Sequence, residues 1–401
     1  MSSRRASSDK QLCALQIFHQ YLDPSENWVY RLLSHCTRTR MVIGAETYLH
    51  NDLYDPRFTY ILSPIHPLSV HPGSPMVQWL NRYIKKLRGV TYPWFLEQQA
   101  RHQGCKLIHS HFANVGWYSL PIAKRLHLPH VVSFYGLDYE WLPFTQPEWR
   151  PRYQDLIDQA DLFICEGEHG IGLLRAMGCP EEKATVVHLG VEVETIPWQI
   201  RKKQAGELHL LQIARLIEKK GHIDTVRAFL KALQHCPNMT LTIAAPGSEK
   251  RRQRLDAVVR RAGAEDAVTF LDWVDFATLH QFMLRYQVFI HPSRHASDRD
   301  CEGGAPVVLI DAEATGMPVI ATDHCDIPEV VVNDRTGLLT PERDVDQLAA
   351  SIERFYWMDQ DEYRTFCEQA RRHVEEEYSA ARSAERLEMV YASLIEQYIR
   401  R

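Results

Sequence analysis

The sequence lacks the features that would indicate a membrane-spanning, nucleic-acid-binding or zinc-stabilised protein. No apolar run approaches the roughly 20 residues that a helix needs to cross a membrane. The formal net charge of −5 is the opposite of the basic footprint typical of nucleic-acid binding. No Cys-x-x-Cys pair occurs among the nine scattered cysteines, so we expect reduced thiols in the cytosol rather than zinc ligands. Residues 1–10, MSSRRASSDK, lack the apolar segment of a secretion signal, and we expect a disordered leader.

What is present is a long alternation of apolar strand segments and helical segments. At 401 residues the chain is long enough for two domains, and its 45% hydrophobic content is ordinary for a soluble enzyme. We predict a first domain over 11–197, a polar and basic linker over 198–206, and a second domain over 207–375. Residues 376–401 carry apolar side chains at helical spacing and are predicted to form a final helix. The alternation indicates an α/β protein with two parallel sheets.

The most informative stretch begins at the apolar run Val288–Ile290 and continues through a glycine turn into a helix. Gly303 and Gly304 allow the backbone to approach a ligand, and Pro306 suits the first turn of a helix over 307–315. A glycine turn that leads into a helix at the carboxyl end of a strand is a typical diphosphate site. Glu302 and Asp311 are placed where both could reach hydroxyl groups of the same ligand.

A second cluster follows the apolar strand LHLLQIA. The segment ARLIEKKGH places Arg215 and Lys220 at the end of this strand, and Gly221 opens the next helix. Two cations and an acidic glycine turn in one domain suit an anionic, hydroxyl-rich ligand such as a nucleotide sugar. We expect Lys219 to be a solvated surface charge and Glu313, on another face of its helix, to be structural.

The order of the motifs ARLIEKKG, LTIAAPGSE, VFIHPS, CEGGAPVVLIDAEATGMPVIAT, IPEVV and DRTGLL resembles the retaining nucleotide-sugar glycosyltransferases of family 4. The resemblance covers the chain from about Leu12 to Tyr398. It implies the GT-B fold, in which two Rossmann-like domains face each other across a cleft and a C-terminal helix crosses back to the first domain. It also implies transfer of a hexosyl group from a nucleotide-diphosphate sugar to a saccharide or glycolipid, in bacterial polysaccharide or glycolipid synthesis.

The resemblance assigns roles to residues of the second domain. Arg215 and Lys220 match the positions that hold the diphosphate, and Glu302 matches the acid that contacts the donor sugar. The usual second glutamate would fall at Ile310, but the register of the following motif instead places Asp311 there, as the ligand of the ribose hydroxyls. The expected donor-binding residues are therefore Gly303, Gly304, Ala305, Pro306 and Asp311.

The first domain is expected to supply the acceptor side. Tyr135 stands where the family often has a histidine, and a tyrosine is a poor base near neutral pH, which favours a front-face retaining mechanism. The other acceptor-side candidates, each of which could instead be a structural residue, are Asp138, His111, Ser25 and Glu26.

No metal and no cofactor are expected. Asp298 and Asp300 form an Asp-x-Asp motif, which binds metal in a different glycosyltransferase fold, and we interpret it here as a polar loop. The basic amphipathic segment 76–88 is either an ordinary domain helix or, as in family members that act on lipids, a peripheral contact with the inner face of the membrane. We expect a cytoplasmic enzyme.

Two other functions stay open. The chain could have another GT-B activity, such as that of a sugar-nucleotide epimerase. The departures at Tyr135 and Asp311 would also suit a non-catalytic module that binds nucleotide sugars.

Overall fold

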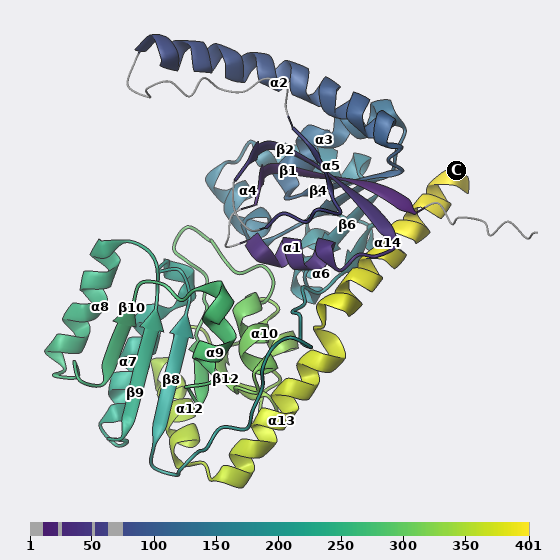
Figure 1. Cartoon of the computed structure of the whole chain (residues 1–401). Helices are drawn as coiled ribbons and strands as arrows, with labels where there is room; N and C mark the ends of the chain where they lie inside the picture. Colours follow the sequence, from purple (N-terminus) through teal and green to yellow (C-terminus); the bar gives the residue numbers. More distant parts are fainter. Residues whose placement is uncertain (1–10, 23–25, 50–52, 63–74, 401) are drawn as a thin grey trace, which may run out of the picture.

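The computed structural model describes residues 11–22, 26–49, 53–62 and 75–400, apart from some side chains between residues 75 and 91. These residues form two α/β domains, each built around one parallel sheet (Figure 1). The predicted leader over 1–10 and the candidate Ser25 lie outside the described residues. None of the helices in the described ranges combines the length and apolar character needed to cross a membrane.

The first domain contains a seven-stranded parallel sheet in the order β3-β2-β1-β4-β5-β6-β7. Its central strand β1 is buried on both faces from Cys13 to Phe18, which explains why this strand reads as a nearly continuous apolar run. The strands are β1 (Leu12–Tyr21), β2 (Thr39–Tyr48), β3 (Thr59–Ile61), β4 (Leu107–His111), β5 (His130–Ser133), β6 (Leu162–Cys165) and β7 (Ala184–Val186).

Helices cover both faces of this sheet. The longest, α2, carries Pro93 in its interior and spans 29 residues. The helical elements are α1 (Asn27–Ser34), α2 (Pro75–Gln103), α3 (Ala113–Leu126), the π-helix η2 (Leu137–Trp141), α4 (Leu142–Thr145), α5 (Trp149–Gln159), α6 (Glu168–Ala176) and the 3₁₀ turn η3 (Glu181–Lys183).

The second domain has a six-stranded parallel sheet in the order β10-β9-β8-β11-β12-β13. Its strands are β8 (Leu208–Ile213), β9 (Met239–Ala244), β10 (Val268–Leu271), β11 (Val288–His291), β12 (Val319–Thr322) and β13 (Gly337–Thr340). Its helical elements are η4 (Glu218–Lys220), α7 (His222–Leu233), α8 (Glu249–Arg261), η5 (Phe276–Thr278), α9 (Leu279–Met283), α10 (Val307–Ala314), α11 (Ile327–Val330), α12 (Val345–Trp357) and α13 (Gln360–Glu377).

The last helix, α14 (Ala380–Arg400), leaves the second domain and runs along the first (yellow in Figure 1). Its apolar face is buried in the core of the first domain through Leu387, Tyr391 and Leu394. The apolar spacing of this segment therefore serves an interdomain contact. The two parallel sheets and this returning helix agree with the α/β class and the two-domain architecture predicted from the sequence.

Candidate active site

A cavity of about 460 Å³ lies between the two domains. Its lining residues follow the carboxyl ends of β8 and β11 in the second sheet and of β5 and β6 in the first. Parallel α/β sheets bind their ligands at this end of the strands. The wall includes Arg215, Lys220, Glu302, Ala305, Pro306 and Asp311 from the second domain and Glu26, Tyr135 and Gly136 from the first.

The domains touch at the rim of this cavity through two glycines. Gly303 has a positive φ of 78°, and a Cβ at either Gly136 or Gly303 would collide with the backbone of the other domain's loop. Gly304 faces the Glu166 side chain of the first domain at similarly short range. The sequence suggested that these glycines open the backbone to a ligand. The structure shows that in this closed arrangement they allow the first domain to approach, while Ala305 and Pro306 line the cavity.

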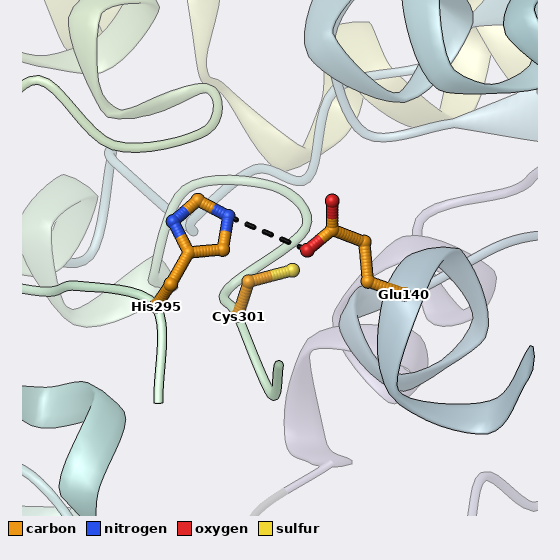
Figure 2. A group of neighbouring side chains, drawn as sticks. All are labelled: Glu140, His295 and Cys301. Carbon is orange, nitrogen blue, oxygen red and sulfur yellow. Dashed lines mark ion pairs between the residues drawn. The ribbon is translucent and has the colours of Figure 1, made fainter. Parts of the chain in front are cut away.

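Contacts between titratable side chains also join the two domains. The His295 Nε2 atom lies 3.5 Å from a carboxylate oxygen of Glu140 in η2 (Figure 2). Arg31 of α1 is paired with Asp311 of α10, with 3.2 Å between Nη1 and Oδ1, and both side chains are buried. Sequence reasoning did not identify Arg31, because an arginine in a first-domain helix gives no local sign of a partner 280 residues away.

Asp311 is therefore not a free carboxylate in this structure. Its Oδ1 also lies 2.9 Å from His280 Nε2. Burial raises the pKa of Asp311, but Arg31 and His280 together outweigh it, so the pKa lies below its ordinary value. A ligand hydroxyl that binds this carboxylate would have to share it with Arg31 or displace that side chain.

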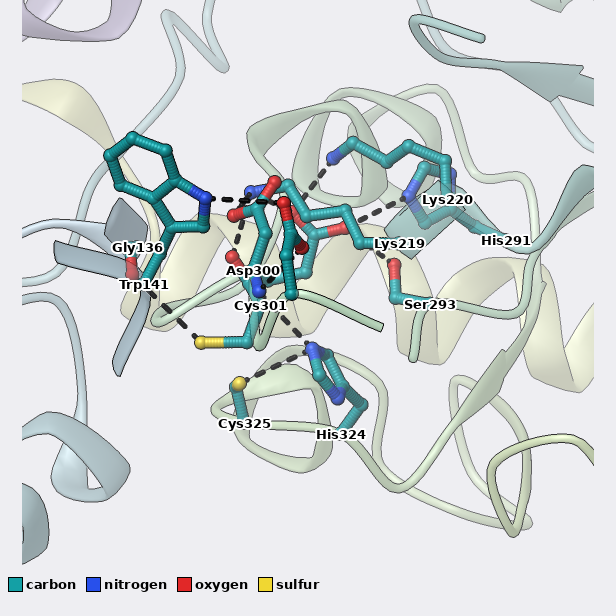
Figure 3. A network of polar contacts seen from close by, with 12 residues as sticks. Gly136, Trp141, Lys219, Lys220, His291, Ser293, Asp300, Cys301, His324 and Cys325 are labelled. Atoms are coloured by element: carbon teal, nitrogen blue, oxygen red, sulfur yellow. Dashed lines mark hydrogen bonds and ion pairs between the residues drawn. The ribbon is translucent and has the colours of Figure 1, made fainter. Parts of the chain in front are cut away.

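Glu302 lines the cavity and is held by a polar network, in which its partners Lys219, Lys220 and Ser293 are labelled in Figure 3. Its Oε2 accepts a hydrogen bond from Lys220 Nζ at 2.8 Å, and its Oε1 accepts one from Ser293 Oγ at 2.7 Å. Burial raises the pKa of Glu302, yet Lys220 and Lys219 reverse the shift and hold the pKa well below its ordinary value. Glu302 is thus an ionised acceptor in a fixed position.

Lys219 corrects one expectation from the sequence. It is a buried side chain rather than a solvated one, and its Nζ lies 2.8 Å from Asp300 Oδ1 and 2.7 Å from the Cys301 carbonyl oxygen. Asp298 accepts a hydrogen bond from the Trp141 indole at 3.2 Å. Both carboxylates of the Asp-x-Asp motif therefore have protein partners, and Lys219 positions the backbone that presents Glu302.

The two predicted phosphate-binding cations differ in their surroundings. Lys220 is largely buried and paired with Glu302, whereas Arg215 is exposed at the cavity wall, and no ion pair of Arg215 is seen among the described residues. Gly221, with φ of 64°, explains the sharp turn after Lys220, because a Cβ there would overlap the Pro292 carbonyl. Of these two cations, Arg215 is therefore available to an anion, whereas Lys220 would have to exchange partners.

The acceptor-side candidates fall into two groups, those that line the cavity and those that are buried away from it. Tyr135 and Glu26 line the cavity, whereas His111 is fully buried behind Tyr135, with Nδ1 2.8 Å from the tyrosine hydroxyl. Burial lowers the pKa of His111 to about 3 and raises that of Tyr135 well above its ordinary value. Both groups are therefore neutral near pH 7. Asp138 is buried and caps its own loop by accepting a hydrogen bond from the Tyr135 amide at 2.9 Å.

A buried polar network that sequence reasoning missed supports this wall. His111 Nε2 lies 3.0 Å from Gln16 Oε1, and the Gln16 amide donates to the Tyr391 hydroxyl at 3.1 Å. The sequence indicated part of this network, because His109 and His111 are two residues apart in β4 and therefore lie on the same face of the sheet. The contribution of Tyr391 could not be predicted from the residues around β4, because Tyr391 lies on α14.

Comparisons with known proteins agree with this geometry. Residues 58–195 match the family described as "Glycosyltransferase Family 4", and residues 207–357 match the family described as "Glycosyl transferases group 1". The chain is 31% identical over 302 residues to the putative colanic acid biosynthesis glycosyltransferase WcaL of Escherichia coli K12, covering 75% of this chain and 73% of that protein. It is 28% identical over 297 residues to the amylovoran biosynthesis glycosyltransferase AmsK of Erwinia amylovora, covering 73% and 72%.

Solved structures show the same fold at low identity. A glycosyltransferase from Rickettsia africae ESF-5 superposes with a TM-score of 0.74 at 14% identity, covering 96% of this chain and 99% of that one. Anabaena Alr3699/HepE in complex with UDP-glucose superposes with a TM-score of 0.69 at 15% identity, covering 95% and 100%. Fold and site thus define a GT-B glycosyltransferase. The chain belongs to glycosyltransferase family 4.

Proposed function

We propose that this protein is a retaining glycosyltransferase that moves a hexosyl group from a nucleotide-diphosphate sugar to a saccharide or glycolipid acceptor. The proposed pathway is bacterial polysaccharide or glycolipid synthesis, because similar proteins are named as glycosyltransferases of colanic acid and amylovoran biosynthesis. The observation that carries the proposal is one cavity that brings Arg215, Lys220 and Glu302 of the second domain opposite Tyr135 of the first.

The charges in this cavity suit departure of a nucleoside diphosphate. Arg215 is available to the diphosphate, and Lys220 would transfer its hydrogen bond from Glu302 to a phosphate oxygen as negative charge develops. The amino end of α10 begins at Val307, just after Pro306, and adds a favourable dipole on the same wall. Glu302, released from Lys220 but still bonded to Ser293, is then free to accept a hydrogen bond from a donor-sugar hydroxyl.

The first-domain wall supports a front-face mechanism. A neutral, buried His111 and a Tyr135 hydroxyl with a raised pKa are both unsuited to remove the acceptor proton. In this mechanism the departing phosphate oxygen takes the acceptor proton, and attack from its side leaves the new bond on the same face of the sugar. Tyr135 and Glu26 line the same cavity, which supports a role for both in hydrogen-bonding the acceptor.

Peripheral membrane contact through 76–88 stays a prediction. Tyr83 and Leu87 of α2 are 62% and 46% exposed, while the side chains of Met76, Arg82, Lys85, Lys86 and Arg88 lie outside the described part of the structure. Sedimentation with vesicles that contain anionic lipid, compared with neutral vesicles, tests this contact. We propose a cytoplasmic enzyme that reaches lipid-linked acceptors in this way.

The proposed function is tested with a panel of UDP- and GDP-hexoses, because the structurally similar Alr3699/HepE was solved in complex with UDP-glucose. We expect nucleoside-diphosphate release that depends on an added oligosaccharide or glycolipid acceptor, and a product whose anomeric configuration by NMR equals that of the donor. Conversion of the donor without an acceptor would indicate an epimerase. Thermal stabilisation by a donor without any turnover would indicate a binding module.

A further inference from the structure

Three side chains with metal-ligating atoms converge beside the cavity from two domains. Glu140 lies on η2 of the first domain, whereas His295 and Cys301 lie on the loop between β11 and α10 of the second. One ligand atom from each of the three lies within 4.8 Å of the other two, and Figure 2 shows their side chains pointing toward one another. The set combines an imidazole, a thiol and a carboxylate, which is a donor set that zinc accepts.

The imidazole of His295 is oriented by a second carboxylate. Its Nδ1 lies 2.9 Å from Glu342 Oε1, and the other oxygen of Glu342 accepts the His295 backbone N–H at 2.9 Å. With Nδ1 as the donor to Glu342, the lone pair of Nε2 faces the Glu140 carboxylate at 3.5 Å. Two acceptors that face each other need either a proton or a cation between them. A carboxylate on the far nitrogen is the usual partner of a metal-bound histidine.

Cys301 completes the group from a rigid backbone. Its side chain is fully buried, and its carbonyl oxygen is held by Lys219 at 2.7 Å. Its thiol donates a long hydrogen bond of 3.9 Å to the Gly136 carbonyl oxygen and lies beside a second thiol, that of Cys325. The sulfur points to the same space as Glu140 and His295 (Figure 2).

We propose that Glu140, His295 and Cys301 form a binding site for Zn²⁺ or a similar divalent cation that bridges the two domains. Binding would replace the Cys301 thiol proton with a sulfur–metal bond and release that proton to solvent, and solvent would fill the fourth position of a tetrahedral site. The ion would join η2 to the loop that presents Glu302. Because the cavity is walled by both domains, an ion that holds them together restricts entry and exit of the nucleotide sugar.

The test uses the untagged full chain, stripped of metal and kept reduced, with Co²⁺ as a spectroscopic probe and Zn²⁺ as the competing ion. We expect one Co²⁺ per chain, a thiolate-to-metal charge-transfer band, and displacement of that band by Zn²⁺. Cys301→Ser should abolish the band. Glu140→Gln and His295→Gln should weaken Zn²⁺ binding by at least the roughly 10–100-fold that loss of an outer partner costs.

Matched controls separate this site from chance binding. Cys325→Ser, next to Cys301, and Glu148→Gln, an exposed first-domain carboxylate, should bind Co²⁺ as the unchanged protein does. An unaltered band in Cys301→Ser, or equal zinc affinity in Glu140→Gln, would overturn the proposal. So would an imidazolium between the carboxylates, visible as a protonated His295 by NMR at neutral pH in the presence of Zn²⁺. None of these readouts depends on glycosyl transfer.

Discussion

Glu302 is the residue on which the sugar-directed part of the proposed chemistry depends. Its carboxylate is held by Ser293 and Lys220 and, in the proposed mechanism, accepts a hydrogen bond from the donor sugar. Loss of this carboxylate should therefore affect binding of the sugar rather than binding of the phosphates. We predict that Glu302→Gln abolishes transfer, while nucleoside-diphosphate binding, measured by calorimetry, survives. Asp298→Asn, which alters a carboxylate that accepts hydrogen bonds from the Trp141 indole and the Asp300 amide, serves as the control. A loss of diphosphate affinity as large as the loss of activity would contradict this role.

The two cations are predicted to matter to a similar degree for different structural reasons. Removing one preorganised group that stabilises developing charge costs about 100-fold or more in turnover, and we expect this from both Arg215→Ala and Lys220→Ala. Arg215 is exposed and its loss should leave the fold intact, whereas loss of Lys220 leaves Glu302 with Lys219 at 4.0 Å. Steady-state kcat is the measurement, and Arg227→Ala, an exposed arginine of α7, is the control. Activity within a few-fold of the unchanged protein would remove that residue from the mechanism.

At the scale of elements, α1 and α10 are joined by the buried pair Arg31–Asp311. Breaking a buried pair by removing one partner typically costs 3–5 kcal/mol, and because His280 stays beside Asp311 we expect about 3 kcal/mol for Arg31→Met. The measurement is the midpoint of thermal unfolding. The double variant Arg31→Met/Asp311→Asn should recover part of the loss, since it leaves no unpaired buried charge.

An exposed pair provides the comparison for this prediction. Lys231 of α7 and Asp346 of α12 lie 2.6 Å apart, but their side chains are 50% and 79% exposed. Lys231→Met should therefore cost no more than about 1 kcal/mol. Equal destabilisation by Lys231→Met and Arg31→Met, or no recovery in the double variant, would show that the interdomain pair does not stabilise this arrangement.

At the scale of the whole molecule, we predict that glycosyl transfer needs no divalent metal. Arg215, Lys220 and the amino end of α10 offer about two charges and roughly half a charge of dipole, which is comparable to a bound Mg²⁺. They reach one cavity only because both glycine-containing turns, at Gly221 and Gly303, fold toward the same sheet edge. Full activity should persist in excess EDTA. Loss of activity that Mg²⁺ or Mn²⁺ restores, with the same effect from Asp298→Ala, would show that the Asp-x-Asp loop binds a catalytic metal.

The sequence by itself determined the parallel α/β architecture and the second-domain wall of the cavity. The architecture depends on short apolar runs that form strands. The cavity wall depends on two short segments, each a loop and a turn that lead into a helix at the end of a strand, and these segments carry Glu302 in one case and Arg215 and Lys220 in the other. Local chemistry fixes these elements, because a turn and the helix after it are specified by neighbouring residues.

Only the tertiary structure decided which charges are buried and what they contact. Lys219 was expected in solvent but is buried, with its amino group bonded to Asp300 and Cys301. These partners are 81 and 82 residues away in the sequence, so the residues around Lys219 do not indicate them. Arg31 meets Asp311 across 280 residues, and Gln16 meets Tyr391 across 375. No short-range pattern encodes such pairs. They arise because helix packing and the return of α14 to the first domain bring together surfaces that are far apart in the sequence.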